Sequence, residues 1–366
     1  MLKQKNYSIQ FLRFLFTMLI CFAHTITTTY LANFKEYGNI SSYIQGSYIV
    51  VLFFFVMSGF YMKHSLRKNV EDYVKDRVLR LWPVMAFSII LFAVFKPLHW
   101  SENSINALDL ATLFFLQGTG VSQDANANGP AWFVCVLFWT STIYFIYMKI
   151  INRKCTQIIS IAILVFFTMF VYIYYLPRVP IRGMIHDCFS LMMLSGFAFV
   201  GFGILLSFFD DWLNKKFNNK LFFESTTTVF KIIYTIAELI LFMVLCVFML
   251  YKLFIPYPYN PLLVVILFCV MFLLFTNKSG YLSSVILNTR IWNFLGRGSY
   301  SVYIMQNFVF VFVFVYHYAM LYENFVKENI VLTLLIIMLA YHVAGYIACF
   351  LVERAVFKYV KNKGGK

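Results

Sequence analysis

The sequence predicts an all-α, polytopic integral membrane protein with about ten transmembrane helices and both termini in the cytoplasm. Of its 366 residues, 61% are hydrophobic and only 12% are charged, whereas a soluble domain is nearer to half apolar and a quarter charged. Long apolar runs recur along the whole chain, and the basic residues gather in alternate connections between them. Together these observations indicate a chain that crosses a lipid bilayer many times.

The apolar runs define the expected spans. A hydrocarbon core of about 30 Å requires roughly 20 apolar residues in a helix. The qualifying runs are approximately 8–30, 43–63, 82–97, 130–149, 156–176, 188–208, 231–252, 261–277, 298–320 and 330–352. An even number of spans places both ends of the chain on the same side of the membrane.

The distribution of Lys and Arg assigns that side. With a cytoplasmic N-terminus, 24 of the 30 basic residues lie in or beside cytoplasmic segments, as the positive-inside rule requires. The other six are Lys35, Lys96, Arg178, Arg182, Lys252 and Lys327. The net charge of +15 is therefore a topology signal. The bilayer is the expected partner, and nucleic acid is not.

The chain is expected to form a single transmembrane domain over residues 1–366, without internal repeats or a separate soluble domain. The segment 98–129 contains "ALDLATLFFLQGTG", which suits a half-membrane helix. The seven cysteines lie mostly in apolar runs, without CxxC or Cys/His spacing. They indicate neither a metal site nor a disulfide framework.

The first predicted span carries two ionisable residues in "RFLFTMLICFAH", Arg13 and His24. Eleven residues make three helical turns plus about 20°, so both side chains share one face, roughly 16 Å apart along the helix. An intramembrane Arg normally faces the protein interior or a water-filled pathway. The alternative is that Arg13 snorkels to the headgroups and His24 bonds to a neighbouring carbonyl.

An amphipathic helix is predicted over about 69–81, "NVEDYVKDRVLRL", on the cytoplasmic side. One face carries Tyr73, Arg77 and Arg80, beside an apolar stripe. The helix suits binding to lipid headgroups at the membrane surface. It equally suits a phosphate site, because two guanidiniums one turn apart present forked donors. Pro83 is expected to begin the third span.

Five short motifs occur in order along the chain. They are Arg-x10-His (Arg13, His24), "FFFVMSGF" (53–60), Arg-x-x-Arg in "DRVLRLWP" (Arg77, Arg80), "GPAWFVCVLFW" (129–139) and "LGRGSYSVYIMQ" (295–306). In this order, over about residues 8–350, they resemble the acyltransferase-3 family of integral membrane acyltransferases.

The resemblance implies transfer of an acyl group, usually acetyl, from cytoplasmic acetyl-CoA to a hydroxyl of a surface or lipid-linked polysaccharide, with no metal. A bacterial plasma membrane is the expected location. His24 matches the family's essential histidine, whereas Arg13, Arg77 and Arg80 match its arginines and are the candidate residues for binding the cofactor. The family usually has His at the position of Gln306, and the acidic pair that many members carry in the fourth helix is absent.

Several further polar or aromatic residues are candidates for binding the acceptor. They are Trp132, His186, Asp187, Tyr303 and Gln306. Glu238 lies deep in a predicted span, which makes it a functional candidate of lower rank.

The residues alone leave alternative functions open. A transporter or flippase of lipid-linked glycans would have a similar helix count and a basic cytoplasmic face, but it usually shows inverted repeats. Within the enzyme class, succinyl-CoA is an alternative donor and a lipid an alternative acceptor. The histidine could act as a general base or hold the acyl group itself.

Overall fold

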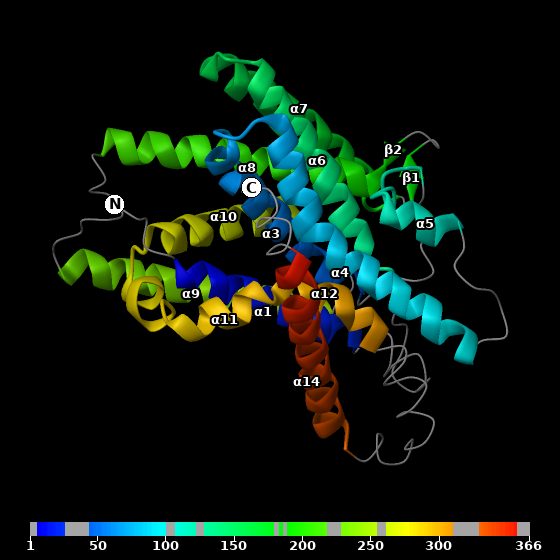
Figure 1. Ribbon diagram of the computed structural model, residues 1–366. Coiled ribbons are helices and arrows are strands. Elements are labelled where there is room, and N and C mark those ends of the chain that lie inside the picture. Colours follow the sequence, from blue (N-terminus) through cyan, green and yellow to red (C-terminus); the bar gives the residue numbers. More distant parts are fainter. Residues whose placement is uncertain are drawn as a thin grey trace. The chain divides into compact units, whose positions relative to one another are not determined.

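A computed structural model describes residues 6–25, 44–99, 107–121, 128–178, 183–185, 189–217, 228–254, 261–309 and 329–356. The described chain is mostly helical (Figure 1). Its longer helices are α1 (Tyr7–Thr25), α3 (Ile44–Tyr61), α4 (Val70–His99), α6 (Ala131–Ile150), α7 (Lys154–Tyr175), α8 (Leu191–Lys216), α9 (Thr228–Phe254), α10 (Pro261–Asn277), α12 (Ser299–Phe308) and α14 (Ile330–Ala348). Each of the ten predicted spans overlaps one of them.

Seven of the described helices are long and apolar enough to cross a membrane, namely α1, α4, α6, α7, α8, α9 and α14. Helices α3 and α10 are apolar but shorter, and α12 is described over ten residues. The protein is thus a helical, multi-pass membrane protein. Ten as the number of spans stays a prediction, as does the side of the termini.

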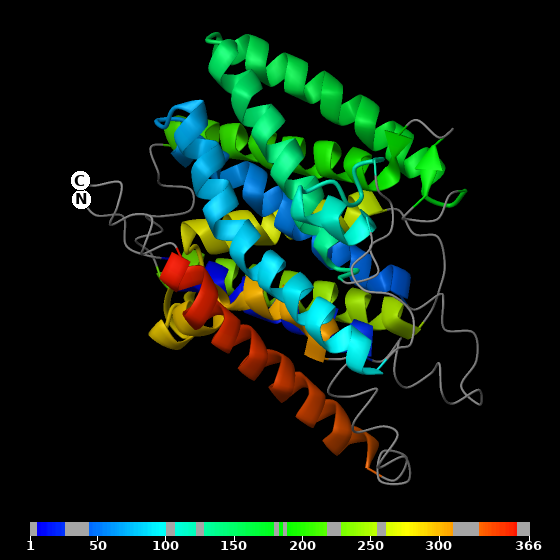
Figure 2. The ribbon, with the colours of Figure 1, turned by 45° about the vertical axis from the view of Figure 1, so that its right-hand side comes forward.

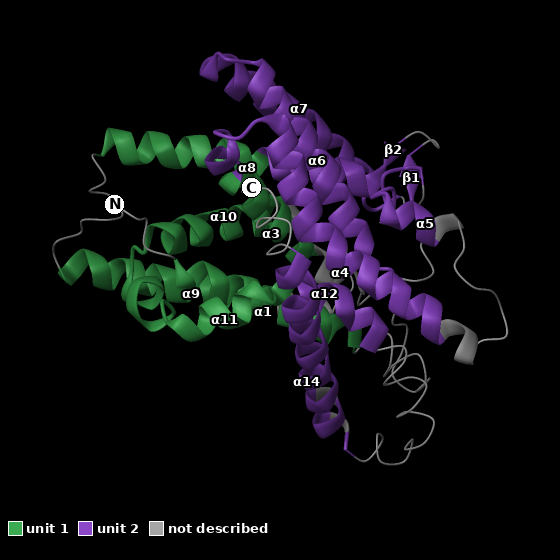
Figure 3. Ribbon diagram, in the orientation of Figure 1, with its two compact units in different colours: residues 1–61, 202–299 green, residues 62–201, 300–366 purple. Residues whose placement is uncertain are grey.

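The chain divides into two compact units, each built from two separate segments (Figure 3). Unit 1 comprises residues 1–61 and 202–299, and unit 2 comprises residues 62–201 and 300–366. The sequence predicts one domain. The chain passes between the units at the end of α3, inside α8 and at the start of α12.

Unit 1 is organised around α1, which packs against α3, α10 and the short α11 (Arg290–Arg297). Figures 1 and 2 show these helices side by side. Its core is aromatic: the ring of Phe53 lies 4.6 Å from that of Phe16 and 5.1 Å from that of Phe268. At Gly203 of α8, an added Cβ would lie 2.0 Å from the carbonyl oxygen of Val56. Only glycine permits this close approach of α8 to α3.

Glu238 has a structural role in unit 1. Its carboxylate, on α9, is fully buried and accepts the backbone N–H of Gly280 at 2.9 Å and that of Ser283 at 3.1 Å. The Ser283 hydroxyl donates to it as well. Gly280 lies in the turn before the π-helical segment η5 (Leu282–Ile286), and Ser283 lies within that segment. We call this set of bonds the Glu238 clasp, and it accounts for an acid buried in a predicted span.

Unit 2 contains α4, which runs without interruption through Pro83. The predicted amphipathic helix and the predicted third span are therefore one helix. Its first turns pack along α6, where the ring of Tyr73 stacks on that of Phe145 at 3.8 Å with an interplanar angle of 2°. Tyr73 is buried, so one face of this segment packs on the bundle.

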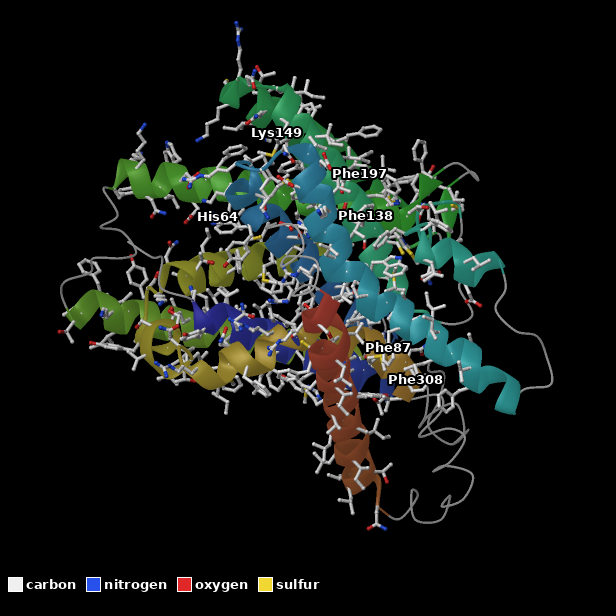
Figure 4. The ribbon with its side chains drawn as sticks, viewed as in Figure 1. His64, Phe87, Phe138, Lys149, Phe197 and Phe308 are labelled. Carbon is white, nitrogen blue, oxygen red and sulfur yellow. The ribbon has the colours of Figure 1, made fainter. Side chains whose placement is uncertain are left out.

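The half-membrane helix expected in 98–129 corresponds to α5 (Ala107–Leu113) and the turn after it. The segment packs against α4 and α6. The Trp82 indole donates to the Leu113 carbonyl at 3.0 Å, and the Trp139 indole donates to the Phe115 carbonyl at 2.9 Å. Phe115 adopts a positive φ of 60°, which is uncommon outside glycine. Its ring stacks on Phe138, labelled in Figure 4, at 4.2 Å.

The other elements complete unit 2. Helix α7 lies beside α6 in both views (Figures 1 and 2), and Tyr147 and Ser160 share a hydrogen bond between them. Most of its outer apolar side chains are exposed, as expected for a lipid-facing helix. Two short strands, β1 (Met184–Ile185) and β2 (Phe189–Ser190), pair antiparallel. The turn η4 (Met62–Ser65) precedes α4, and η7 (Cys349–Glu353) follows α14.

Candidate functional site

Helix α1 carries both Arg13 and His24, as the sequence predicts. The helix is continuous from Tyr7 to Thr25, so the eleven-residue spacing places both side chains on one face, about 16 Å apart along the axis. Both side chains are half-buried. His24 lies in the last turn, where the Thr25 hydroxyl donates to the Cys21 carbonyl at 2.8 Å.

Arg13 lies in a polar cluster of unit 1 that the sequence did not reveal. Its Nη1 donates to Gln10 Oε1 at 3.1 Å. The Tyr61 hydroxyl interacts electrostatically with both Arg13 and Asp210. Asp210 is buried on α8 and accepts the Asn277 amide N–H at 2.9 Å. The cluster therefore contains a carboxylate, that of Asp210, in the region of the half-buried positive charge of Arg13.

In unit 2, Arg77 is oriented by the buried Tyr73. Arg77 Nε donates to the Tyr73 hydroxyl at 3.1 Å, and the guanidinium lies 5.2 Å from the centre of the tyrosine ring. The Tyr73 hydroxyl in turn reaches the Ser141 carbonyl at 3.5 Å. Phe145 packs on the Tyr73 ring, and the Ser141 carbonyl of α6 contacts the Tyr73 hydroxyl. Tyr73 is therefore fixed in position, and it orients Arg77.

Arg80 follows one turn later and is exposed. It interacts electrostatically with Arg77, Glu353 and Tyr300. The Tyr300 hydroxyl donates to the Leu81 carbonyl, and the Ser301 hydroxyl donates to Glu353 Oε2 at 3.0 Å. Two guanidiniums of like charge at i and i+3 repel each other, and an anion bridging them removes that repulsion. The pair has the donors and the charge to bind a phosphate.

Helix α12 carries two of the candidate acceptor-binding residues. The Tyr303 hydroxyl donates to the Pro130 carbonyl at 2.9 Å, and its ring meets that of Phe133 edge to face at 5.7 Å. Gln306 is 2% exposed, and neither of its amide atoms has a hydrogen-bond partner among the described residues. Phe308, labelled in Figure 4, marks the end of α12 where it packs on Phe95 of α4 at 5.5 Å.

The remaining candidates are distributed as follows. Trp132 is buried at the start of α6, where an added Cβ on Gly118 would lie 3.2 Å from the tryptophan Cβ. His186 and Asp187 lie outside the described residues. Arg13 and His24 belong to unit 1, whereas Arg77, Arg80, Trp132, Tyr303 and Gln306 belong to unit 2.

Sequence reasoning missed Asp210 and Glu353. Asp210 stands in "FFDDW" at the end of a predicted span, where a pair of acids usually marks a solvated helix end. The usable signal was the pair itself, since adjacent residues point 100° apart on a helix and only one of the two could face inward. Glu353 gave no signal, because its partner Ser301 is 52 residues away.

Comparison with known proteins gives one match. The family model described as an acyltransferase domain, of the acyltransferase-3 family, matches residues 6–354. Neither the curated proteins nor the solved structures gave a match. The matched region contains every predicted catalytic and cofactor-binding residue and all the long helices. The chain therefore belongs to the acyltransferase-3 family, and it is a membrane acyltransferase.

Proposed function

We propose that this protein is an O-acyltransferase that moves an acetyl group from cytoplasmic acetyl-CoA to a hydroxyl of a surface or lipid-linked polysaccharide. The family supports acyl transfer in general. The observation that carries the acetyl-CoA part is the arginine pair on α4: Arg77 oriented by Tyr73, and Arg80 exposed one turn later.

The arginine pair suits the nucleotide end of coenzyme A. Coenzyme A carries a diphosphate and a 3′-phosphate, and guanidinium groups bind phosphate oxygens through paired N–H donors. Arg77 is already oriented, so little side-chain entropy is lost on binding. Of the two arginines, Arg80 is exposed and Arg77 is half-buried.

His24 is the proposed catalytic residue. Imidazole is effective near neutral pH either as a general base or as a nucleophile. In the direct route, the acceptor oxygen attacks the thioester carbonyl carbon while His24 takes the hydroxyl proton. The carbon–sulfur bond then breaks, and the proton passes to the departing thiolate to give free coenzyme A. In the two-step route, the imidazole nitrogen carries the acetyl group before the hydroxyl receives it.

Arg13 is the proposed third cofactor-binding residue. It shares a face of α1 with His24, and its half-buried charge suits the walls of a polar passage. Arg13 is proposed to contact the acyl-bearing arm of acetyl-CoA, and His24 is proposed to act on the acyl group. Asp210 would then be a positioning residue for this arginine.

The test is acetyl-CoA binding to the purified, detergent-solubilised protein, with an Arg77→Ala/Arg80→Ala variant beside it. The matched control is Arg67→Ala/Lys75→Ala, which removes the same charge from exposed positions nearby. We expect tight binding by the wild type and by the control, and loss of at least tenfold in affinity in the arginine variant. No binding by well-folded wild type would reject an acyl-CoA enzyme and favour a transporter of lipid-linked glycans. Competition by succinyl-CoA identifies the preferred donor.

A further inference from the structure

A row of polar side chains follows one ridge of α12. Tyr300, Tyr303 and Gln306 are spaced at i, i+3 and i+6, and residues three apart are neighbours on a helix surface. The row begins at the arginine pair, because Tyr300 interacts electrostatically with Arg80 and its hydroxyl donates to the carbonyl of the next residue, Leu81. It therefore leads from the proposed phosphate site along the helix.

The members of this row differ in how their polar atoms are satisfied. The Tyr300 hydroxyl is bonded to the Leu81 carbonyl, and the Tyr303 hydroxyl to the Pro130 carbonyl. Gln306 is 2% exposed, and both its Oε1 and its Nε2 are buried without a hydrogen bond to any residue that the structure describes. A buried amide group left unpaired loses its hydrogen bonds to water without replacement, which destabilises the folded protein. Such groups are rare in native structures, which points to a ligand that supplies the missing bonds.

The missing partner must both donate and accept, since the glutamine amide offers an oxygen acceptor and an N–H donor. A secondary amide meets both needs. The pantetheine arm of coenzyme A contains two secondary amides between its diphosphate and its sulfur. A hydroxyl of the acceptor can also both donate and accept a hydrogen bond. The distance from the proposed phosphate site to Gln306 therefore has to distinguish the pantetheine arm from the acceptor.

The distance favours the pantetheine arm. Gln306 lies six residues after Tyr300, which is about 9 Å along the helix. In an extended pantetheine arm, at about 1.25 Å per bond along its length, the first amide lies about 6–7 Å from the nearest phosphorus and the second about 11–12 Å from it. The glutamine amide thus falls between the two, within side-chain reach of either.

We propose that Gln306 binds an amide of the pantetheine arm of acyl-CoA and so sets the depth to which the arm enters beside α12. The inference rests on the proposed function, because it takes the phosphates to be bound at Arg77 and Arg80. Gln306 is a binding residue in this proposal. An amide can bind the arm without taking part in proton transfer, so the proposal does not require the histidine that the family usually has at this position.

The test compares two ligands on a Gln306→Met variant. Methionine keeps the unbranched shape and removes the amide. Acetyl-CoA has the pantetheine arm, whereas adenosine 3′,5′-bisphosphate lacks it and keeps two of the phosphates. We expect the variant to bind acetyl-CoA about tenfold more weakly and to bind the bisphosphate with unchanged affinity. Its thermal midpoint without ligand should equal or exceed that of the wild type, because an unpaired buried amide has been removed.

Gln157→Met is the matched control. Gln157 is a buried glutamine of α7 whose Nε2 donates to the Met148 carbonyl at 2.9 Å and also to that of Ile151. This variant should lower the thermal midpoint and leave the ratio of the two affinities unchanged. If Gln306→Met binds acetyl-CoA as the wild type does, the proposal is wrong, and it is equally wrong if only transfer to the acceptor is lost. Failure of the wild type itself to bind acetyl-CoA would instead reject the proposed function.

Discussion

Tyr73 lies flat against Phe145, with the two rings 3.8 Å apart and 2° from parallel, and its hydroxyl receives the N–H of Arg77. A tyrosine in a predicted surface helix thus becomes the link between α6 and an arginine of the proposed phosphate site. The ring provides packing, whereas the hydroxyl provides orientation. The two contributions can be separated by substitution.

Tyr73→Phe should weaken acetyl-CoA binding by roughly three- to tenfold, because Arg77 Nε loses its acceptor while the ring stack remains. The thermal midpoint should fall by less than in Tyr73→Ala, which removes the stack as well. Isothermal titration and thermal unfolding in the same detergent measure the two effects. Equal acetyl-CoA affinities of Tyr73→Phe and wild type would show that the hydroxyl does not orient Arg77.

His24→Ala should abolish acyl transfer. The rate should fall at least a hundredfold, because a general base typically contributes that much or more. Acetyl-CoA binding and the thermal midpoint should change little, because the side chain is half-buried at the end of α1. The assay is incorporation of labelled acetyl groups into endogenous acceptors of isolated membranes. Full transfer by a folded His24→Ala protein would remove His24 from the mechanism.

Asp210→Ala should lower the free energy of unfolding by about 1–3 kcal/mol, because Asn277 loses its buried acceptor and the region of Arg13 loses a negative charge. The neighbouring Asp211→Ala provides the control. Asp211 is exposed, and its removal should change stability by no more than about 0.5 kcal/mol. Similar losses in both variants would contradict a special role for Asp210.

Glu238→Gln should destabilise the protein by a similar amount without changing the affinity for acetyl-CoA. A glutamine amide would present N–H groups to a pocket that already contains the backbone donors of Gly280 and Ser283. Thermal unfolding with and without saturating acetyl-CoA measures both quantities. Lost transfer in a protein of undiminished stability would instead identify Glu238 as a functional acid.

The helical elements were predictable because an apolar run of about 20 residues indicates a membrane-spanning helix. Every predicted span overlaps a helix of the described chain, and the family could be recognised from five motifs. The join between the amphipathic segment and the third span was missed because Pro83 is typical of a helix start. In α4 it is instead tolerated inside the helix, as happens where neighbouring groups satisfy the freed carbonyl.

The candidate site was predictable in its residue types and only partly in its contacts. Arg13 and His24 share a helix, so their spacing sufficed. The support of Arg77 by Phe145 joins residues 68 positions apart, and no local pattern encodes such a pair. Asp210 and Asp211 look alike in the sequence, and only the rotation of α8 makes one of them buried. The unpaired amide of Gln306 is likewise a property of its surroundings.

The Glu238 clasp has a mechanical consequence for α9. Lipid offers no hydrophobic drive to hold one helix against another, and over residues 228–248 most apolar side chains of α9 are exposed. The helix has 27 residues, or about 40 Å, against a hydrocarbon core of about 30 Å. It must therefore tilt or extend beyond that core. The clasp, together with the bond from the Tyr281 N–H to the Thr235 hydroxyl, ties α9 to the turn at Gly280, so a change in bilayer thickness that tilts α9 also moves that turn.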